Sequence, residues 1–335
     1  MTGGPLIVPC APRGRADAPA HATAATPGHA TPGHAATATP VTTTPATAVR
    51  DLSLPTEPGR ADTPVLPATV TAVTSPAASI RRLTLSSPAF RDLVLTGPDE
   101  YLGLLMPEPG RAVPPVDPTG TNLRAAVNAL PAPDRPLLRW YSVRNLRRDA
   151  VAPDGSPTGE IDVDVLVHGD SGPGSRWALR ARPGRRCAVS PAGGIWCRAS
   201  TRQLLVADPT AVPALRSILE FTRDHHPAEL ADLHVVVLAS GPADLEPGLR
   251  DKWEGSVGTL ATVTGATVTE QAREVTTLLS GWAAAGHPAT GAGYAWVCGE
   301  QGLCKDVRRV LVDTWGLAGA DVRWVTYWIL GRERP

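Results

Sequence analysis

The chain has 335 residues, enough for two domains and a tail, and its 32 Lys and Arg balance its 32 Asp and Glu. The balanced charge predicts no nucleic-acid partner, and no apolar run approaches the ~20 residues that span a bilayer, so no membrane partner is expected either. The apolar cluster at residues 6–8 is too short for a signal-peptide core, and we expect a cytoplasmic protein that is a monomer. Five cysteines without a CxxC pair disfavour a disulfide framework and a zinc site, and no metal site is expected.

Residues 1–64 form a segment rich in Ala, Thr, Pro and Gly, with few large apolar side chains. Ordering such a segment would lose conformational entropy without enough burial to offset the loss. We therefore expect a disordered tail. The folded part is expected to begin at residue 65.

Residues 65–198 contain short β-rich runs separated by Pro and Gly. In one of them, apolar residues from Ile161 onward alternate with Asp162 and Asp164, a pattern typical of a strand with one wet face. A Pro-rich stretch at 107–120 and a predicted short helix at 122–130 are interpreted as an insertion on the rim of the barrel that these strands would form. Six such strands with one helix predict a small closed antiparallel barrel, with strands at 70–73, 80–85, 101–105, 139–144, 161–168 and 187–189.

Residues 199–335 change to continuous apolar runs, as expected for parallel strands that are buried on both faces. Alternation of strand and helix predicts right-handed crossovers and a doubly wound α/β sheet, which binds nucleotides at the carboxyl ends of its strands. The predicted strands lie at 204–207, 234–238 and 294–298, and the predicted helices at 210–221, 269–285 and 300–315.

One strand of the predicted barrel combines a cation, an aromatic face and a hydroxyl, in Arg139, Tyr141 and Ser142. A planar guanidinium suits a diphosphate, and an aromatic ring with a nearby hydroxyl suits an isoalloxazine. Strand alternation places Arg139 and Tyr141 on one face and Ser142 on the other, so the hydroxyl reaches the same ring only at a strand end or a bulge. An ordinary half-buried strand is the alternative for this hexapeptide taken alone.

The motif resembles the Arg-x-Tyr-Ser/Thr flavin signature of the ferredoxin-reductase superfamily. Together with residues 160–164 and 168–178, the run from 138 to 144 resembles the siderophore-interacting proteins, which are FAD-dependent ferric-siderophore reductases. The resemblance covers roughly residues 66–332. It implies a six-stranded antiparallel flavin-binding barrel at 65–198 and a doubly wound NAD(P)H-binding domain at 199–335.

The resemblance also implies roles for particular residues. Ser142 is the candidate catalytic residue, since its hydroxyl would tune the flavin. The family's basic residue is replaced by Ile329 here, and Arg144, Arg81 or Arg332 could supply the charge instead. Of these, Arg144 and Arg332 are the candidate substrate-binding residues, with a solvated surface arginine as the alternative for each. His168 is expected at the flavin, with a general-base role as the alternative. The implied cofactor-binding residues are Arg139, Tyr141, Ser142, Val143, His168, Gly169, Gly174, Ser175, Trp177, Asp208, Thr210, Cys298, Gly299 and Glu300.

The implied activity is electron transfer from NAD(P)H through FAD to a ferric siderophore, with release of iron(II) in the cytoplasm. Two departures from the family pattern bear on it: Ala207 stands where the family has Gly, and Ile329 stands where the family has a basic residue. They keep a binding protein without turnover open as an alternative. A flavin reductase that serves a partner oxygenase is the other alternative.

Overall fold

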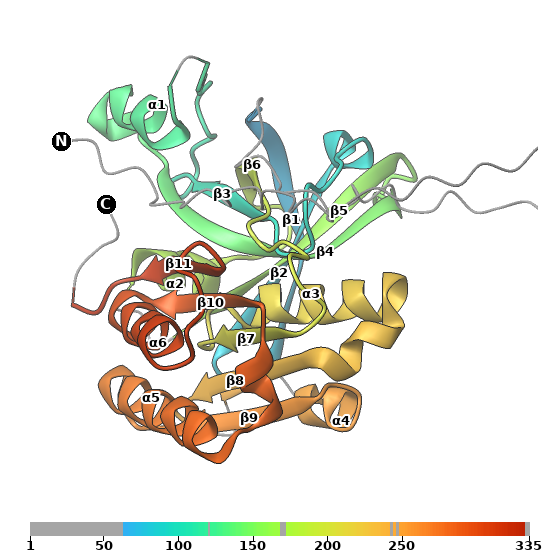
Figure 1. Cartoon of the computed structure of the whole chain (residues 1–335). Helices are drawn as coiled ribbons and strands as arrows, with labels where there is room; N and C mark the ends of the chain where they lie inside the picture. The colour runs from blue at the N-terminus through green and yellow to red at the C-terminus, as the bar shows by residue number, and fades with distance from the viewer. Residues whose placement is uncertain (1–62, 120, 168–171, 242–243, 246–247, 332–335) are drawn as a thin grey trace, which may run out of the picture.

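The computed structural model describes residues 63–119, 121–167, 172–241, 244–245 and 248–331. These residues form a closed six-stranded barrel followed by a five-stranded parallel sheet, with helices on both faces of the sheet (Figure 1). Both predicted fold elements, the barrel and the α/β sheet, are confirmed. The predicted tail lies outside the described residues except for its last two positions. None of the described helices is long and apolar enough to cross a bilayer.

The barrel strands run in the order β1-β2-β5-β4-β3-β6, and every neighbouring pair is antiparallel. All six predicted strands are present, and β4 runs well past its predicted end because its outer half pairs with β5 in a long hairpin. The short rim helix, α1, and a second helix, α2, pack against the barrel. The bounds are β1 Leu66–Ala77, β2 Ile80–Ser87, β3 Tyr101–Met106, α1 Leu123–Ala129, β4 Leu137–Val151, β5 Pro157–Leu166, α2 Pro173–Arg180 and β6 Arg186–Gly193.

The predicted wet face of β5 is wrong. Asp162 and Asp164 are 7% and 9% exposed. The Asp164 carboxylate accepts two hydrogen bonds of 2.7 Å from Arg82, and the Asp162 carboxylate accepts hydrogen bonds of 2.6 and 2.9 Å from Arg147. Long arginine side chains from neighbouring strands therefore cover these carboxylates, which alternation along one strand cannot reveal.

The parallel sheet has the order β11-β10-β7-β8-β9. Helices α3 and α4 cover one face and α5 and α6 cover the other (Figure 1). Two strands, β9 and β11, are absent from the sequence prediction, and both lie at the edges of the sheet. The bounds are β7 Gln203–Ala207, α3 Val212–His225, β8 Leu233–Ala239, α4 Leu249–Trp253, β9 Thr259–Thr264, α5 Val268–Ala285, β10 Tyr294–Glu300, α6 Gln301–Asp313 and β11 Val322–Trp328.

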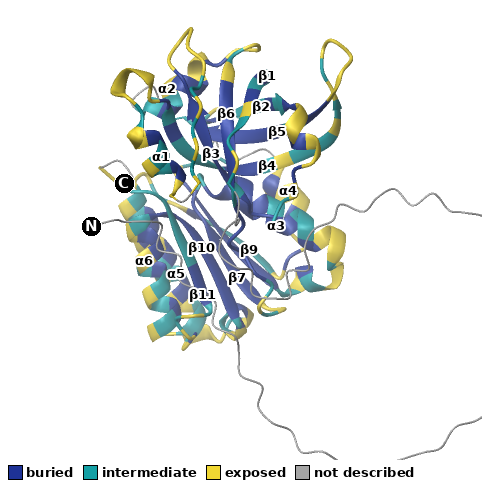
Figure 2. Ribbon diagram, turned by 90° about the horizontal axis from the view of Figure 1, so that it is seen from above, coloured by how far each residue is buried: buried dark blue, intermediate teal, exposed yellow. Residues whose placement is uncertain are grey.

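Burial explains which strands could be predicted. Every residue of the central strands β7, β8 and β10 is buried, whereas β9 and β11 are largely half-buried (Figure 2). A strand that is covered on both faces reads as a continuous apolar run, and an edge strand does not.

A buried carboxylate fastens the two domains at their junction. Asp99 precedes β3, and its side chain accepts hydrogen bonds from the amides of Ile195 and Trp196 and from the indole of Trp296 on β10, at 2.9 to 3.1 Å. Burial raises the pKa of Asp99 to about 6, although these donors oppose the rise. The segment that leaves β6 is therefore held against the second domain before the chain enters β7.

Candidate functional site

A cleft of about 190 Å³ lies where the barrel meets the carboxyl end of the parallel sheet. The barrel contributes Arg139 to Ser142 of β4 and the end of β5. The second domain contributes the turn between β7 and α3, including Thr210, and the end of β11 with Tyr327 and Trp328. Segments from both domains thus form a single site at the switch region where α/β sheets bind ligands.

Arg139, Tyr141 and Ser142 of the β4 motif all line this cleft. Burial raises the pKa of Tyr141 to about 12, with Arg139 opposing the rise, so the phenol is neutral at physiological pH. Its ring is half-buried and packs against the barrel core. The ring is therefore held in place beside the cleft.

The first turn of α2 approaches Tyr141 and Arg139 closely. A Cβ atom at Gly174 would lie 2.6 Å from the Tyr141 hydroxyl and 3.5 Å from Cγ of Arg139, so only glycine permits this approach. Pro173 has no N–H, and the first intrahelical bond runs from the Arg176 amide to the Gly172 carbonyl at 2.9 Å. The amides of Gly174 and Ser175 thus precede that bond, at a helix end that attracts phosphate oxygens.

Ser142 reaches the same cleft from the opposite side of the strand. The register of β4 against β5 shifts between Val143 and Asn145, just after Ser142, whereas β4 pairs with β3 in regular register through Ser142. The Ser142 hydroxyl lies 3.4 Å from the Tyr327 hydroxyl of β11. A residue of the second domain therefore contacts the hydroxyl that we expect beside the reactive part of a flavin.

Asp208 organises the sheet side of the cleft. The Asp208 carboxylate accepts hydrogen bonds from the amide and hydroxyl of Thr210 at 2.8 and 2.5 Å, from the Glu300 amide at 2.9 Å and from the Trp328 indole at 2.7 Å. Burial raises the pKa of Asp208. Gly299 has a φ of 148°, and a Cβ there would lie 2.5 Å from Cγ of Asp208. Asp208 thus joins β7, β10 and β11, while Thr210 faces the cleft.

Cys298 and Glu300 are held inside the fold. Cys298 is fully buried, and burial raises the pKa of its thiol well above the ordinary value. The Glu300 carboxylate accepts hydrogen bonds from the amide of Leu303 at 3.0 Å, where it caps α6, and from the amide of Leu330 at 3.1 Å. Contact of Cys298 and Glu300 with a nicotinamide remains a prediction. In the structure, the Cys298 thiol is buried in the core and the Glu300 carboxylate caps α6.

Other predicted residues lie beside the cleft or outside the described residues. The Val143 side chain is in the barrel core, and its amide donates to the Glu100 carbonyl at 2.8 Å. Trp177 also packs in that core, and the Ser175 hydroxyl donates to the Leu166 carbonyl at 3.4 Å. Cofactor contact by these residues remains a prediction. Three predicted residues, His168, Gly169 and Arg332, lie outside the described residues.

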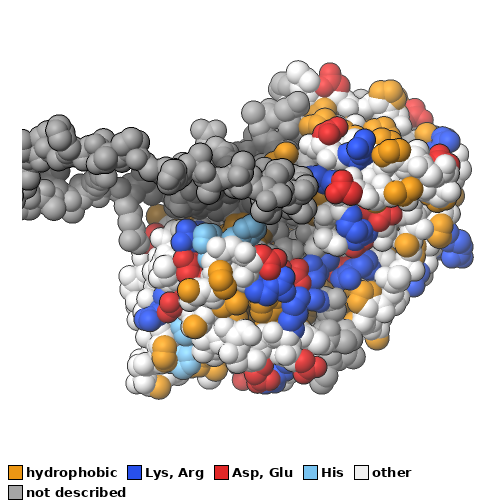
Figure 3. Space-filling model, turned by 90° about the vertical axis from the view of Figure 1, so that its right-hand side faces the viewer, with side chains coloured by type: hydrophobic (Ala, Val, Ile, Leu, Met, Phe, Trp, Pro, Cys, Tyr) orange, Lys and Arg blue, Asp and Glu red, His pale blue; other side chains and the backbone are white. Residues whose placement is uncertain are grey.

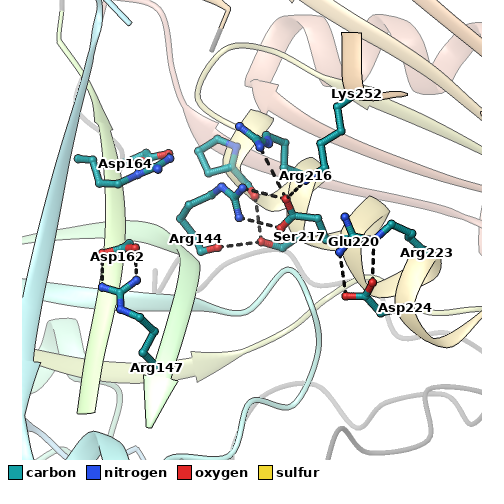
Figure 4. Close-up of polar contacts among 12 residues, drawn as sticks. Arg144, Arg147, Asp162, Asp164, Arg216, Ser217, Glu220, Arg223, Asp224 and Lys252 are labelled. Atoms are coloured by element: carbon teal, nitrogen blue, oxygen red, sulfur yellow. Dashed lines mark hydrogen bonds and ion pairs between the residues drawn. The ribbon is translucent and has the colours of Figure 1, made fainter. Parts of the chain in front are cut away.

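Arg144, predicted to bind substrate, makes an ion pair between the domains. Its guanidinium donates to both carboxylate oxygens of Glu220 on α3, at 2.9 and 3.0 Å (Figure 4). Lys252 donates to the same carboxylate at 2.8 Å, and Arg216 lies 3.6 Å away. On this side of the molecule, cationic and anionic side chains are interspersed (Figure 3). A substrate role for Arg144 therefore competes with this pairing and stays a prediction.

Several residues that line the cleft lie outside the predicted set, among them Arg124 of α1, Asp164 of β5, and Tyr327 and Trp328 of β11. The Tyr-Trp pair carried a signal, because residues 325–332 resemble the family's Gly-Tyr-Trp-Arg-x-Gly. Arg124 carried none, since it lies in an insertion with no motif.

The side chains fit FAD. Arg139 and the start of α2 can hold a diphosphate, and Tyr141 and Ser142 can hold a ring system. Barrel, sheet order and cleft together place the chain among ferredoxin-reductase-like flavoproteins. The chain belongs to the siderophore-interacting protein family: residues 69–195 match the model described as the siderophore-interacting FAD-binding domain, and residues 200–331 match that of siderophore-interacting protein.

Curated relatives match only in part. The mycobactin import ATP-binding/permease protein IrtA of Mycolicibacterium smegmatis is 29% identical over 52% of this chain, and the ferric vibriobactin reductase ViuB of Vibrio cholerae is 33% identical over 26% of it. The chain spans 19% and 30% of these relatives' own lengths.

Among solved structures, the siderophore-interacting protein SipS from Aeromonas hydrophila is 26% identical, with a TM-score of 0.59, over 81% of this chain and 94% of that one. The likeness therefore extends over both domains and nearly the whole of the solved protein.

Proposed function

We propose that the protein is an NAD(P)H-dependent, FAD-containing reductase of ferric siderophores that releases iron as iron(II). The observation that carries the proposal is the close approach of the first turn of α2 to Arg139 and Tyr141, two residues that line a cleft shared with the carboxyl edge of the parallel sheet. The similarity to a ferric vibriobactin reductase supports the same reaction class.

Each group in the cleft has a distinct task in this proposal. Arg139 and the amides of Gly174 and Ser175 bind the diphosphate of FAD, because they bring fixed positive charge and oriented donors together. Tyr141 orients the ring system, and Ser142 offers a hydroxyl at its edge. Bound FAD supplies the chemistry that accepts an electron pair and passes electrons on singly.

Thr210 lies on the side of the cleft where we expect the nicotinamide to bind. It lies at the carboxyl end of β7, where doubly wound sheets bind dinucleotides, and Asp208 fixes both its amide and its hydroxyl. Tyr327 and Trp328 close the space between this turn and β4. A nicotinamide that stacks on the flavin would have to share or take this space.

An anaerobic stopped-flow experiment tests the proposal. Purified protein loaded with FAD is mixed with NADH or NADPH while the flavin absorbance is followed, and ferric chelates are then added with a colorimetric iron(II) trap. Bleaching of the flavin followed by iron(II) formation is the expected result. If neither nicotinamide bleaches the flavin, the nicotinamide-dependent reaction is refuted. Tight chelate binding without iron(II) formation would identify a binding protein instead.

A further inference from the structure

The turn between β7 and α3 is the first strand-to-helix junction of the parallel sheet. Asp208 accepts hydrogen bonds there from the amide and the hydroxyl of Thr210, at 2.8 and 2.5 Å. In doubly wound sheets the pyrophosphate of a dinucleotide lies at this first turn, and the adenosine ribose lies beyond the carboxyl end of the next strand. That strand is β8, which pairs in parallel with β7. We therefore expect the ribose at the end of β8.

A short turn at the end of β8 carries a carboxylate. The Ser240 amide donates to Oδ2 of Asp244 at 3.0 Å, and the Asp244 amide donates to the Gly241 carbonyl at 3.1 Å. Leu245, the next residue, packs against the apolar cluster on the α3 and α4 face of the sheet. Hydrogen bonds and packing thus hold the Asp244 carboxylate beside the first residue that follows β8.

The end of β9 lies next to this turn and is joined to it. Ala239 of β8 pairs with Thr264 of β9. The buried side chain of Gln271 on α5 donates to the Ser240 hydroxyl at 3.3 Å and to the Gly265 carbonyl at 3.0 Å. The ends of the two strands therefore form one hydrogen-bonded unit at the carboxyl edge of the sheet.

The charged residues in these two segments are acidic. In the sequence, residues 239–249 contain Asp244 and Glu246, residues 264–272 contain Glu270, and neither segment contains Lys or Arg. The first arginines beyond them, one in α4 and one in α5, are exposed and pair with nearby glutamates. A 2′-phosphate would bring about two negative charges to this edge, where neither segment supplies a cation. A free ribose hydroxyl, in contrast, can donate to a carboxylate.

We propose that Asp244 is a specificity-determining residue that selects NADH over NADPH. Its carboxylate accepts a hydrogen bond from a ribose hydroxyl of NADH and repels the 2′-phosphate of NADPH, so attraction and repulsion favour the same dinucleotide. This inference rests on the proposed function and names the nicotinamide dinucleotide that the reductase takes.

The test measures binding to the full-length protein loaded with FAD, without turnover. ADP-ribose and 2′-phospho-ADP-ribose, which differ only in the phosphate, are titrated calorimetrically into the wild type, Asp244→Asn and the matched control Asp224→Asn. Asparagine keeps an oxygen that can accept from the Ser240 amide, so the turn should keep its shape. Asp224 is exposed and lies at the end of α3 away from the β7 turn.

We expect the wild type to bind ADP-ribose at least about tenfold more tightly than its phosphorylated form. Asp244→Asn should reduce this ratio at least about fivefold, and the control should keep it. A wild type that binds both nucleotides equally, prefers the phosphorylated one or binds neither would overturn the inference. A ratio that Asp244→Asn leaves unchanged would overturn it as well.

A parallel stopped-flow experiment separates this inference from the proposed function. Equal rates of flavin bleaching by NADH and NADPH at the same subsaturating concentration would leave the reductase in place and overturn the selectivity. The expected binding ratio without bleaching by either nucleotide would support the selectivity and refute the nicotinamide-dependent reaction.

Discussion

Replacing Glu220 with glutamine perturbs the ion pair that joins the two domains. Glu220 on α3 binds Arg144 of β4 and Lys252 of α4, and the Arg144 side chain is only 10% exposed. Glutamine has nearly the same shape, but it leaves the buried guanidinium without its countercharge. Removing one partner of a buried pair is costly because the remaining charge stays desolvated.

The pKa of Glu220 gives the magnitude. Burial alone would raise this pKa, but the hydrogen bonds and charges of Arg144 and Lys252 outweigh burial and lower it from 4.5 to about 2. A shift of this size corresponds to about 3 kcal/mol of stability. Because the folded-state pKa lies below the unfolded value, this stabilisation is present above pH 4.5 and is lost as the pH falls toward 2.

Urea unfolding at pH 7, followed by tryptophan fluorescence, measures the effect. We expect Glu220→Gln to lower the free energy of unfolding by about 2–4 kcal/mol, and the gap from the wild type to narrow as the pH is lowered below 4.5. The control is Glu254→Gln, which removes an exposed pair with Arg250 and should leave the midpoint unchanged. A Glu220→Gln midpoint equal to that of the control at pH 7 would refute this account of the domain junction.

Three further predictions follow from close packing and burial. Gly174→Ala should weaken FAD binding at least about tenfold in a fluorescence titration, because its Cβ would lie 2.6 Å from the Tyr141 hydroxyl and displace α2; unchanged affinity would contradict the diphosphate site. Gly299→Ala should lower the thermal midpoint, since its φ is 148° and its Cβ would lie 2.5 Å from Cγ of Asp208; an unchanged melting curve would contradict this. Burial lowers the pKa of His234 to about 4, so stability should fall as the pH drops from 6.5 to 4, and His234→Gln should flatten that dependence in urea titrations.

Local sequence patterns were sufficient to predict the architecture of both domains. Alternation and Pro/Gly punctuation located the six barrel strands, and fully apolar runs located β7, β8 and β10, because a strand buried on two faces has a continuous apolar sequence. The motif at Arg139, Tyr141 and Ser142 was singled out through its resemblance to a family signature, because the hexapeptide alone fits an ordinary half-buried strand equally. The edge strands β9 and β11 were missed because one side of each is only partly covered.

What the tertiary structure decided is which distant residues meet. Nothing near Arg144 in the chain points to Glu220, and nothing near Asp162 points to Arg147 as its cover, because both pairs form between separate elements. Arg124 lines the cleft from a helix whose preceding residue, Leu123, packs over Gly103 of a strand about 20 residues earlier. The sequence by itself therefore determined the barrel, the α/β sheet and the residue types of the candidate site, because propensity and periodicity act along the chain. Side-chain partners and the completed cleft depended on contacts between elements far apart in the chain, which only the folded structure specifies.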